Sequence, residues 1–320
     1  TNGFSTAEPL AVARAIGPKV GRTMEPYRFT HPPVARVSGY APLKGSTDAD
    51  LRFDVDGGEF TWWLFRLPNI AGAVHWQGET LALRNIQAGF YWGNATGQAD
   101  FDFSRDAPGT DFGFAASFTN VNLPLLMADL LVRTNHLEGW LNGQLVITNA
   151  NSSISNSWQG HGHVRLRDGL IWEIPIFGVL SRPLDSLIPG LGNSRFTDGS
   201  ARFSITNSVV FSDDLEMRAP AMRLQYQGTV GFDGQVNARV EAELFRDTWL
   251  IGRVVSLALW PVTKLIEYKV TGPLNNPKSE PLYMPARLLF LPLHPFQMLE
   301  DIFTSEPPKT NAPPVFKPVP

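Results

Sequence analysis

The strongest constraint on the fold is a strict alternation of apolar and polar side chains that returns many times along the chain. Between residues 200 and 245, apolar residues occupy every second position in run after run, and the residues between them are polar or charged. A period of two predicts β-strands with one buried and one solvated face. Short turns separate the runs at Asn207-Ser208, Asp213-Asp214, Pro220 and Asp233-Gly234. Because turns this short join antiparallel neighbours, the segment predicts an antiparallel meander.

The same alternation fills the segment from 34 to 118. Leu51, Phe53 and Val55 alternate with charged residues there, and a strand that is apolar on both faces is predicted over 60–65. Further strands are predicted over 136–148, 158–167, 170–174 and 268–272, with a polar turn over 149–157 and a hairpin turn at Asp168-Gly169. The fold class that follows is mainly β: an elongated, curved antiparallel sheet with a few flanking helices.

A few segments have helical spacing instead. Asn122 is a good N-cap, and the leucine-rich stretch after it is predicted to be helical through about Val132. A helix that begins at Pro175 is expected to kink at Pro183 and to end at Pro189. Other helices are predicted within 9–20, 247–266 and 284–303.

These predictions divide the chain into four parts. Residues 1–37 are assigned to an N-terminal helix and connector, and residues 38–277 to a β-sheet domain. Residues 278–305 are assigned to a C-terminal helical segment. Residues 306–320 are rich in proline without apolar periodicity, which predicts a disordered or polyproline tail.

Composition narrows the function classes. Of the 320 residues, 43% are hydrophobic and 18% are charged, and there are 21 Phe and 9 Trp. The chain must therefore cover a large apolar area or leave part of it to a ligand. The formal net charge is -3 and the Lys and Arg residues are scattered, so no basic stripe for nucleic acid is expected. The absence of cysteine excludes disulfides and thiolate metal sites without fixing the compartment.

Motifs that would carry chemistry are weak. His161 and His163 share one face of a strand and suit zinc, but Arg165 and Arg167 continue that face, so a solvated stripe is the better interpretation. The carboxylates of 54–57 and the Glu241/Glu243 pair are likewise interpreted as solvated strand residues. No nucleophile elbow or phosphate-binding glycine loop is present. We therefore expect no catalytic residue, no metal and no cofactor.

Six short motifs follow one another in an order that resembles the C-terminal region of AsmA-like proteins, the superfamily of the TamB type. The resemblance covers about residues 51–277, and its specific part is the order of the motifs. They lie at 120–126, 137–143, 160–170, 174–187, 196–244 and 270–277.

The resemblance implies a protein of the cell envelope of diderm bacteria. Members are anchored in the inner membrane and project an elongated, folded-over β-sheet into the periplasm. Its concave apolar face carries phospholipid acyl chains toward the outer membrane, and no enzymatic activity belongs to the family. Residues 38–277 would be the AsmA-like β-groove. This chain has no N-terminal membrane helix, so we expect it to be periplasmic and tethered through a segment absent from it.

Two arrangements of the apolar strand residues stay open: an acyl-chain groove, or a closed core under the helices. The predicted lining residues are Val164, Leu166, Phe203, Ile205, Met222, Leu224, Tyr226, Val230, Phe232, Val236 and Val240. The expected partners are a phospholipid or another acyl-chain ligand, envelope membrane proteins, and no nucleic acid. A second hypothesis is an assembly factor whose sheet edge pairs with strands of outer-membrane proteins. A third is an all-β enzyme with a scattered site.

Overall fold

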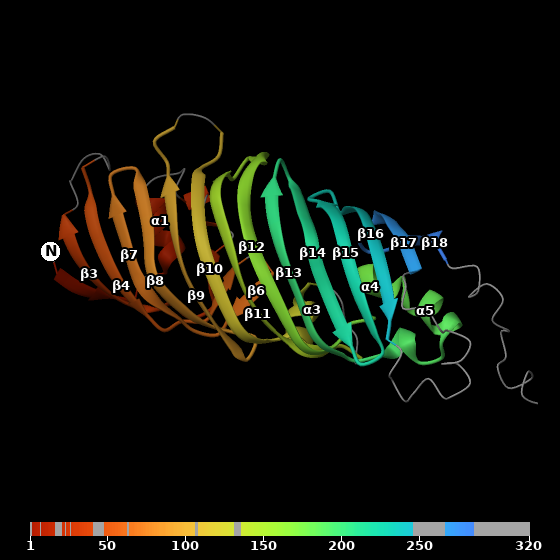
Figure 1. Ribbon diagram of the computed structural model, residues 1–320. Helices are drawn as coiled ribbons and strands as arrows, with labels where there is room; N and C mark the ends of the chain where they lie inside the picture. Colours follow the sequence, from red (N-terminus) through yellow and green to blue (C-terminus); the bar gives the residue numbers. More distant parts are fainter. Residues whose placement is uncertain are drawn as a thin grey trace, which may run out of the picture.

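One long antiparallel sheet dominates the computed structural model, which describes residues 2–6, 8–16, 21–22, 24–25, 27–40, 48–62, 64–105, 108–130, 136–245 and 266–284. The sheet has 15 strands, and a second sheet has three. Figure 1 shows the large sheet as a long array in chain order, with the helices beside it. The predicted mainly β, antiparallel fold is confirmed.

The large sheet is a meander in which most neighbours in space are also neighbours in sequence, and every pair is antiparallel. Its order is β1 (Asn2–Ser5), β3 (Val34–Tyr40), β4 (Asp50–Asp56), β7 (Ile70–Gln77), β8 (Thr80–Phe90), β9 (Gly93–Asp102), β10 (Asp111–Asn122), β11 (Glu138–Asn151), β12 (Ile154–Leu170), β13 (Phe196–Thr206), β14 (Val209–Ala219), β15 (Met222–Gly231), β16 (Gln235–Leu244), β17 (Ile266–Pro273) and β18 (Lys278–Tyr283). The small sheet consists of β2 (Tyr27–Phe29), β5 (Phe60–Trp62) and β6 (Phe65–Leu67).

The helices are short. They are α1 (Pro9–Ile16), α3 (Leu123–Asp129), α4 (Pro175–Gly178), α5 (Ser181–Leu187) and the 3-10 turn η1 (Leu191–Asn193). The predicted start of α3 is confirmed, because the side-chain oxygen of Asn122 accepts a hydrogen bond of 3.0 Å from the backbone N–H of Leu125. The predicted helix within 9–20 is present as α1.

The strand register lines up apolar residues across thirteen strands, from β3 to β17. Each member of this row lies opposite the next in the neighbouring strand, so all point to one face of the sheet. The apolar row consists of Val37, Phe53, Val74, Leu83, Ala99, Phe114, Ile147, Gly160, Ile205, Val210, Val230, Val236 and Gly272. We call the face that carries this row the apolar face and the opposite one the polar face.

The prediction of a hairpin at Asp168-Gly169 and a separate strand over 170–174 is wrong. Strand β12 continues through both residues to Leu170, and residues 171–174 lie outside any strand. Asp168 has a φ of 51°, and the pairing register with β11 shifts beside it. The Asp-Gly pair therefore forms part of a β-bulge. A bulge, like a hairpin turn, can contain a residue in the left-handed backbone conformation. The predicted turn over 149–157 is likewise much shorter, because β11 and β12 extend into it.

The single strand predicted over 60–65 is wrong as well. It is the hairpin of β5 and β6, in which Trp62 lies opposite Phe65. The predicted connector over 27–37 contains β2 and the start of β3. In both places the apolar residues pack as a separate small sheet, which the alternation alone did not reveal.

Two further segments differ from the helix predictions. The helix from Pro175 is divided into α4 and α5, and Pro183 lies in the first turn of α5, where a missing N–H costs nothing. Residues 278–283, assigned to a helical segment, form β18, and Ile266 begins β17. The predicted helices over 247–265 and 285–303 and the tail over 306–320 lie outside the described residues.

Glycines on the apolar face let large side chains of the neighbouring strand lie flat. Gly162 is opposite Phe203, and a Cβ added to Gly162 would stand 2.5 Å from Phe203 Cζ. Gly143 is opposite Phe118, whose Cζ would stand 2.7 Å from an added Cβ. Such glycines allow the phenylalanine rings to approach the neighbouring backbone, which a side chain would block. The rings therefore protrude less from the apolar face.

We predict that Gly162→Ala lowers the free energy of unfolding by about 1–3 kcal/mol, because the new methyl group would overlap Phe203 and the carbonyl oxygen of Gln144. The urea midpoint measures this. Gly199→Ala on β13 is the matched control: its new methyl group would meet the flexible end of Met217 first, so its loss should be smaller. Equal losses in both variants would contradict the role given to the Phe203 contact and the backbone.

Candidate functional site

The N-terminal end of the apolar face is covered by α1 and by the small sheet. Ala13 of α1 is buried in a cluster with Trp76 and Leu81 of the large sheet. Further along, Trp62 of β5 makes an edge contact with Phe114, at 6.2 Å between ring centroids, and Phe65 of β6 contacts Phe90 at 6.0 Å. These contacts place the small sheet over β8 and β10.

The C-terminal end is covered by α4, α5 and η1. Leu180 and Leu184 are fully buried against the sheet, and the ring of Phe177 meets Tyr226 edge-on at 5.3 Å. Leu123 and Met127 of α3 belong to the same cluster. Figure 1 shows α4 and α5 together at this end of the sheet and α1 toward the other end.

Between these covers the apolar face carries half-buried side chains beside the buried Ile147 and Ile205. We call the half-buried set the central apolar segment; it consists of Ala116, Phe118, Leu145, Val164, Phe203, Val210 and Val230 on β10–β15. Its side chains share a face with the apolar row and retain partial contact with solvent. Three of them, Leu145, Phe203 and Val210, also pack against the buried Ile147 and Ile205.

The structure divides the predicted lining residues into two sets. Val164, Phe203 and Val230 are half-buried within the central apolar segment, and Phe232 is 45% exposed beyond the end of β15, where it contacts Trp158. The others are buried, and most lie in the core that α4 and α5 cover: Leu166, Ile205, Met222, Leu224, Tyr226, Val236 and Val240. The predicted lining residues therefore differ in burial along one face: some are part of a closed core and others keep partial contact with solvent.

Four residues of the central apolar segment are absent from the predicted lining set: Ala116, Phe118, Leu145 and Val210. The strands of the first three alternate apolar and polar residues as the meander of 196–244 does. The predicted lining residues were nevertheless taken mainly from the C-terminal strands, because the alternation is most regular there. Pattern strength does not reveal which strands the helices cover, so the most regular strands turned out to be the most buried.

Two hollows in the described surface have mixed linings. One, of about 520 Å³, lies over β7–β11 and includes Leu81, Phe101 and Phe112 beside Arg84 and Asp100. The other, of about 130 Å³, lies over β14–β16 and is lined mostly by charged and amide side chains, with Tyr226 as its single predicted lining residue. Neither is an apolar pocket.

A half-buried aspartate ties the small sheet to α3. Asp129 accepts hydrogen bonds from Arg66 Nη2 at 2.8 Å, Arg66 Nε at 3.0 Å and the hydroxyl of Tyr91 at 2.6 Å. Burial, with the hydrogen bond to Asp129 second, raises the pKa of Tyr91 well above its ordinary value. The protonated hydroxyl therefore remains a donor, and the three side chains join β6, the β8–β9 turn and α3.

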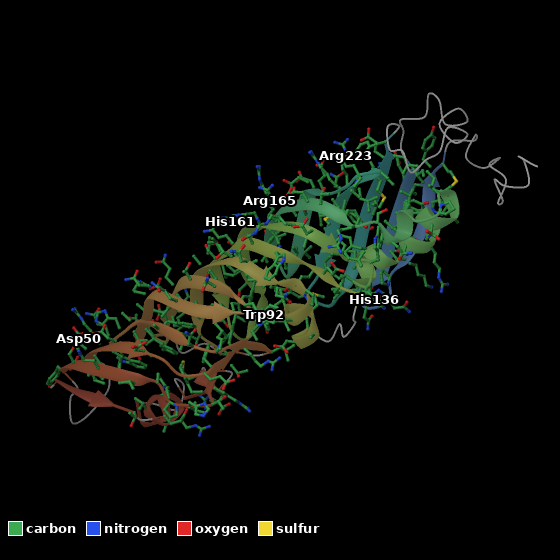
Figure 2. The ribbon with its side chains drawn as sticks, turned by 90° about the horizontal axis from the view of Figure 1, so that it is seen from below. Asp50, Trp92, His136, His161, Arg165 and Arg223 are labelled. Atoms are coloured by element: carbon green, nitrogen blue, oxygen red, sulfur yellow. The ribbon has the colours of Figure 1, made fainter. Side chains whose placement is uncertain are left out.

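The polar face carries ion pairs between neighbouring strands. Arg223 of β15 pairs with Glu243 at 2.5 Å and with Glu216 at 3.5 Å. Figure 2 shows His161, Arg165 and Arg223 on the same long side of the sheet. His161 and His163 lie opposite Ser204 and Arg202. Across the described ranges, no three or more His, Cys, Asp or Glu side chains are grouped closely enough to hold a metal ion.

Glu216 has a pKa below its ordinary value of 4.5. Burial acts to raise it, but hydrogen bonds from Arg218 and Gln225 and the charges of Arg218 and Arg223 outweigh burial. A carboxylate with a lowered folded-state pKa stabilises the fold above its unfolded pKa, and this stabilisation is lost as the pH falls through the folded value.

Comparison with known proteins finds no match: no family model, no curated protein and no solved structure is significantly similar to the chain. Within the described ranges, no helix is both long and apolar enough to span a bilayer.

Asp129→Asn should loosen the small sheet, because the neutral amide cannot replace the charge-assisted bonds to Arg66 and leaves the Tyr91 hydroxyl less well satisfied. A local loss of about 1–3 kcal/mol is expected, measured as faster hydrogen–deuterium exchange in β5 and β6. Asp198→Asn, which removes the partner of Arg165 on the polar face, is the control. Unchanged exchange in the Asp129 variant would show that the small sheet is held by its aromatic contacts alone.

Glu216→Gln should lower stability at neutral pH and reduce the further loss on acidification, because the variant has no carboxylate to protonate below pH 4.5. Urea midpoints between neutral and acidic pH measure both effects. Glu280→Gln, an exposed position on β18, serves as the control. An acid profile that parallels the unmodified protein would rule out Glu216 as a contributor.

Proposed function

We propose that the protein is a non-enzymatic lipid-binding groove that carries acyl chains, such as those of phospholipids, within the cell envelope. The observation that carries this proposal is the apolar row, which runs across thirteen strands, together with the half-buried side chains of the central apolar segment between the two covers. In this proposal the sheet bends about its apolar face to form a folded-over groove, of which the central apolar segment is the open floor.

The dimensions of the central apolar segment suit a hydrocarbon tail. Neighbouring strands lie about 4.8 Å apart, so the six strands from β10 to β15 span roughly 24 Å across the strands. One leaflet of a bilayer core is about 15 Å thick, so a single acyl chain fits along this direction. Each buried CH₂ contributes about 0.8 kcal/mol, which holds such a chain without any special chemistry.

The sheet surface favours sliding contacts over fixed ones. Phe118 and Phe203 lie over glycines of neighbouring strands, so they add apolar area without forming a barrier. Hydrophobic contacts are non-directional, and an acyl chain can therefore shift along the row at little cost. This property supports transport rather than storage at one site.

The resemblance to AsmA-like proteins supports a place in the periplasm, with a tether to the inner membrane supplied by sequence outside this chain. In that setting the groove would move phospholipid between membranes and support outer-membrane lipid homeostasis. Membrane proteins of the envelope would be its partners.

The alternative of an assembly factor that pairs its sheet edge with client strands has less support. The last strand of the order, β18, contains Pro281 among charged residues. Proline lacks a donor, and charges on an edge strand discourage pairing. Leu282 and Tyr283 are exposed there, but they supply side-chain contacts and no backbone template.

The test is phospholipid binding by the full chain, measured by native mass spectrometry and by titration with a fluorescent phospholipid. Val164→Gln places an amide in the central apolar segment and should weaken binding about tenfold. Val146→Gln on β11 is the matched control, because Val146 is equally half-buried and lies on the polar face opposite His161.

Urea midpoints would show that both variants fold. Failure of the unmodified protein to bind phospholipid, or equal weakening in both variants, would contradict the proposal. Leu224 and Val240 are unsuitable positions because both are fully buried beneath the helices, where a polar substitution would test folding instead of binding.

A further inference from the structure

Within the part of the chain that the structure describes, three buried hydroxyl groups on the apolar face have no hydrogen-bond partner: Ser212 Oγ, Tyr226 Oη and Tyr268 Oη. The two tyrosines are 4% and 2% exposed. Nearly all buried polar groups in proteins are hydrogen-bonded, so three such groups in one region need an explanation. Phenylalanine at either tyrosine position would supply the same ring without an unsatisfied oxygen.

The three side chains come from two adjacent rows of the same face. Tyr226 and Tyr268 lie on either side of Val240, in strands β15 and β17. Ser212 of β14 lies in the next row, opposite Gly228, which is opposite Ala238. Because Gly228 and Ala238 are small, the floor beside the two tyrosine rings is low.

This low floor continues into the central apolar segment. The row beyond Ser212 contains Val210 and Val230, which face each other across β14 and β15 and are half-buried. On the other side, the ring of Phe177 in α4 stands against Tyr226. The helices α4 and α5 thus cover Tyr226 and belong to the same core cluster as Tyr268, and the half-buried Val210 and Val230 lie on the side of Ser212 away from the tyrosines.

The chemistry of the surroundings selects a neutral hydrogen-bond acceptor. Among the described residues of these two rows, no side chain is charged, whereas Arg223, Glu216 and Glu243 project from the opposite face. A carboxylate here would be buried without a counter-charge, which is unfavourable. Burial raises the pKa of both tyrosines, so their hydroxyls stay protonated as donors.

We propose that Ser212, Tyr226 and Tyr268 bind the ester carbonyl oxygens of an acyl lipid at the helix-covered end of the apolar face. The inference rests on the proposed lipid-binding function and deepens it, because it makes the ligand an ester lipid instead of any hydrocarbon. The ester group enters from the Val210–Val230 side and displaces the contact of Phe177 with Tyr226. The hydroxyls that lack partners in the covered state gain them in the loaded state, which favours loading.

The experiment compares the affinity of the full chain for dioleoyl phosphatidylcholine with that for its diether analogue, which has the same chains and headgroup without carbonyl groups. The unmodified protein should bind the ester lipid about fivefold more tightly for each hydrogen bond formed. In the double variant Tyr226→Phe/Tyr268→Phe, this ratio should fall toward one while diether binding stays unchanged.

Tyr283→Phe on β18, where the tyrosine is 54% exposed, is the matched control and should keep the ratio of the unmodified protein. The lipid-free double variant should be at least as stable as the unmodified protein, because it loses only unsatisfied groups. Thermal unfolding measures this and shows that the fold persists.

Three outcomes would overturn the inference. Equal affinity of the unmodified protein for the two lipids would show that the hydroxyls do not bind the ester group, although the protein still binds lipid. A double variant that loses both lipids equally would show that the tyrosines act by packing. Failure to bind either lipid would remove the proposed function together with this inference.

Discussion

The structure depends on the agreement between side-chain alternation and strand register. In a β-strand a shift of one residue moves every side chain to the opposite face, so a row of apolar residues across thirteen strands requires correct pairing at every step. Bulges interrupt β8, β11 and β14, and the apolar side chains resume the same face after each one. Burial of that face therefore selects the register, and the register in turn makes the face continuous.

A continuous apolar face on so long a sheet extends beyond the area that the described helices cover. The described helices are short, and they lie toward the two ends, where Ala13 and Leu184 are buried against the strands. Between them Phe118, Val164 and Phe203 keep partial contact with solvent. Exposed hydrocarbon is unfavourable in water, and in the proposed function an acyl chain would cover it.

Polar groups in this structure lie at positions that the hydrophobic argument does not explain. The Tyr91–Asp129–Arg66 contacts hold the small sheet in place on the N-terminal side of the central apolar segment. On the other side, the hydroxyls of Tyr226 and Tyr268 are buried without a hydrogen-bond partner among the described residues. The small sheet is thus tied to α3 by charge-assisted hydrogen bonds, whereas the two tyrosines proposed to bind an ester lie under the C-terminal cover.

The sequence by itself determined the class of fold and the existence of an apolar face, because a period of two admits no other regular structure and short turns admit only antiparallel neighbours. It predicted the Asn122 cap for the same local reason. Only the tertiary structure decided which part of the face is open. Leu224 and Val164 have the same alternating pattern, yet one is fully buried and the other half-exposed, because coverage depends on where distant helices pack, and strand periodicity carries no information about that.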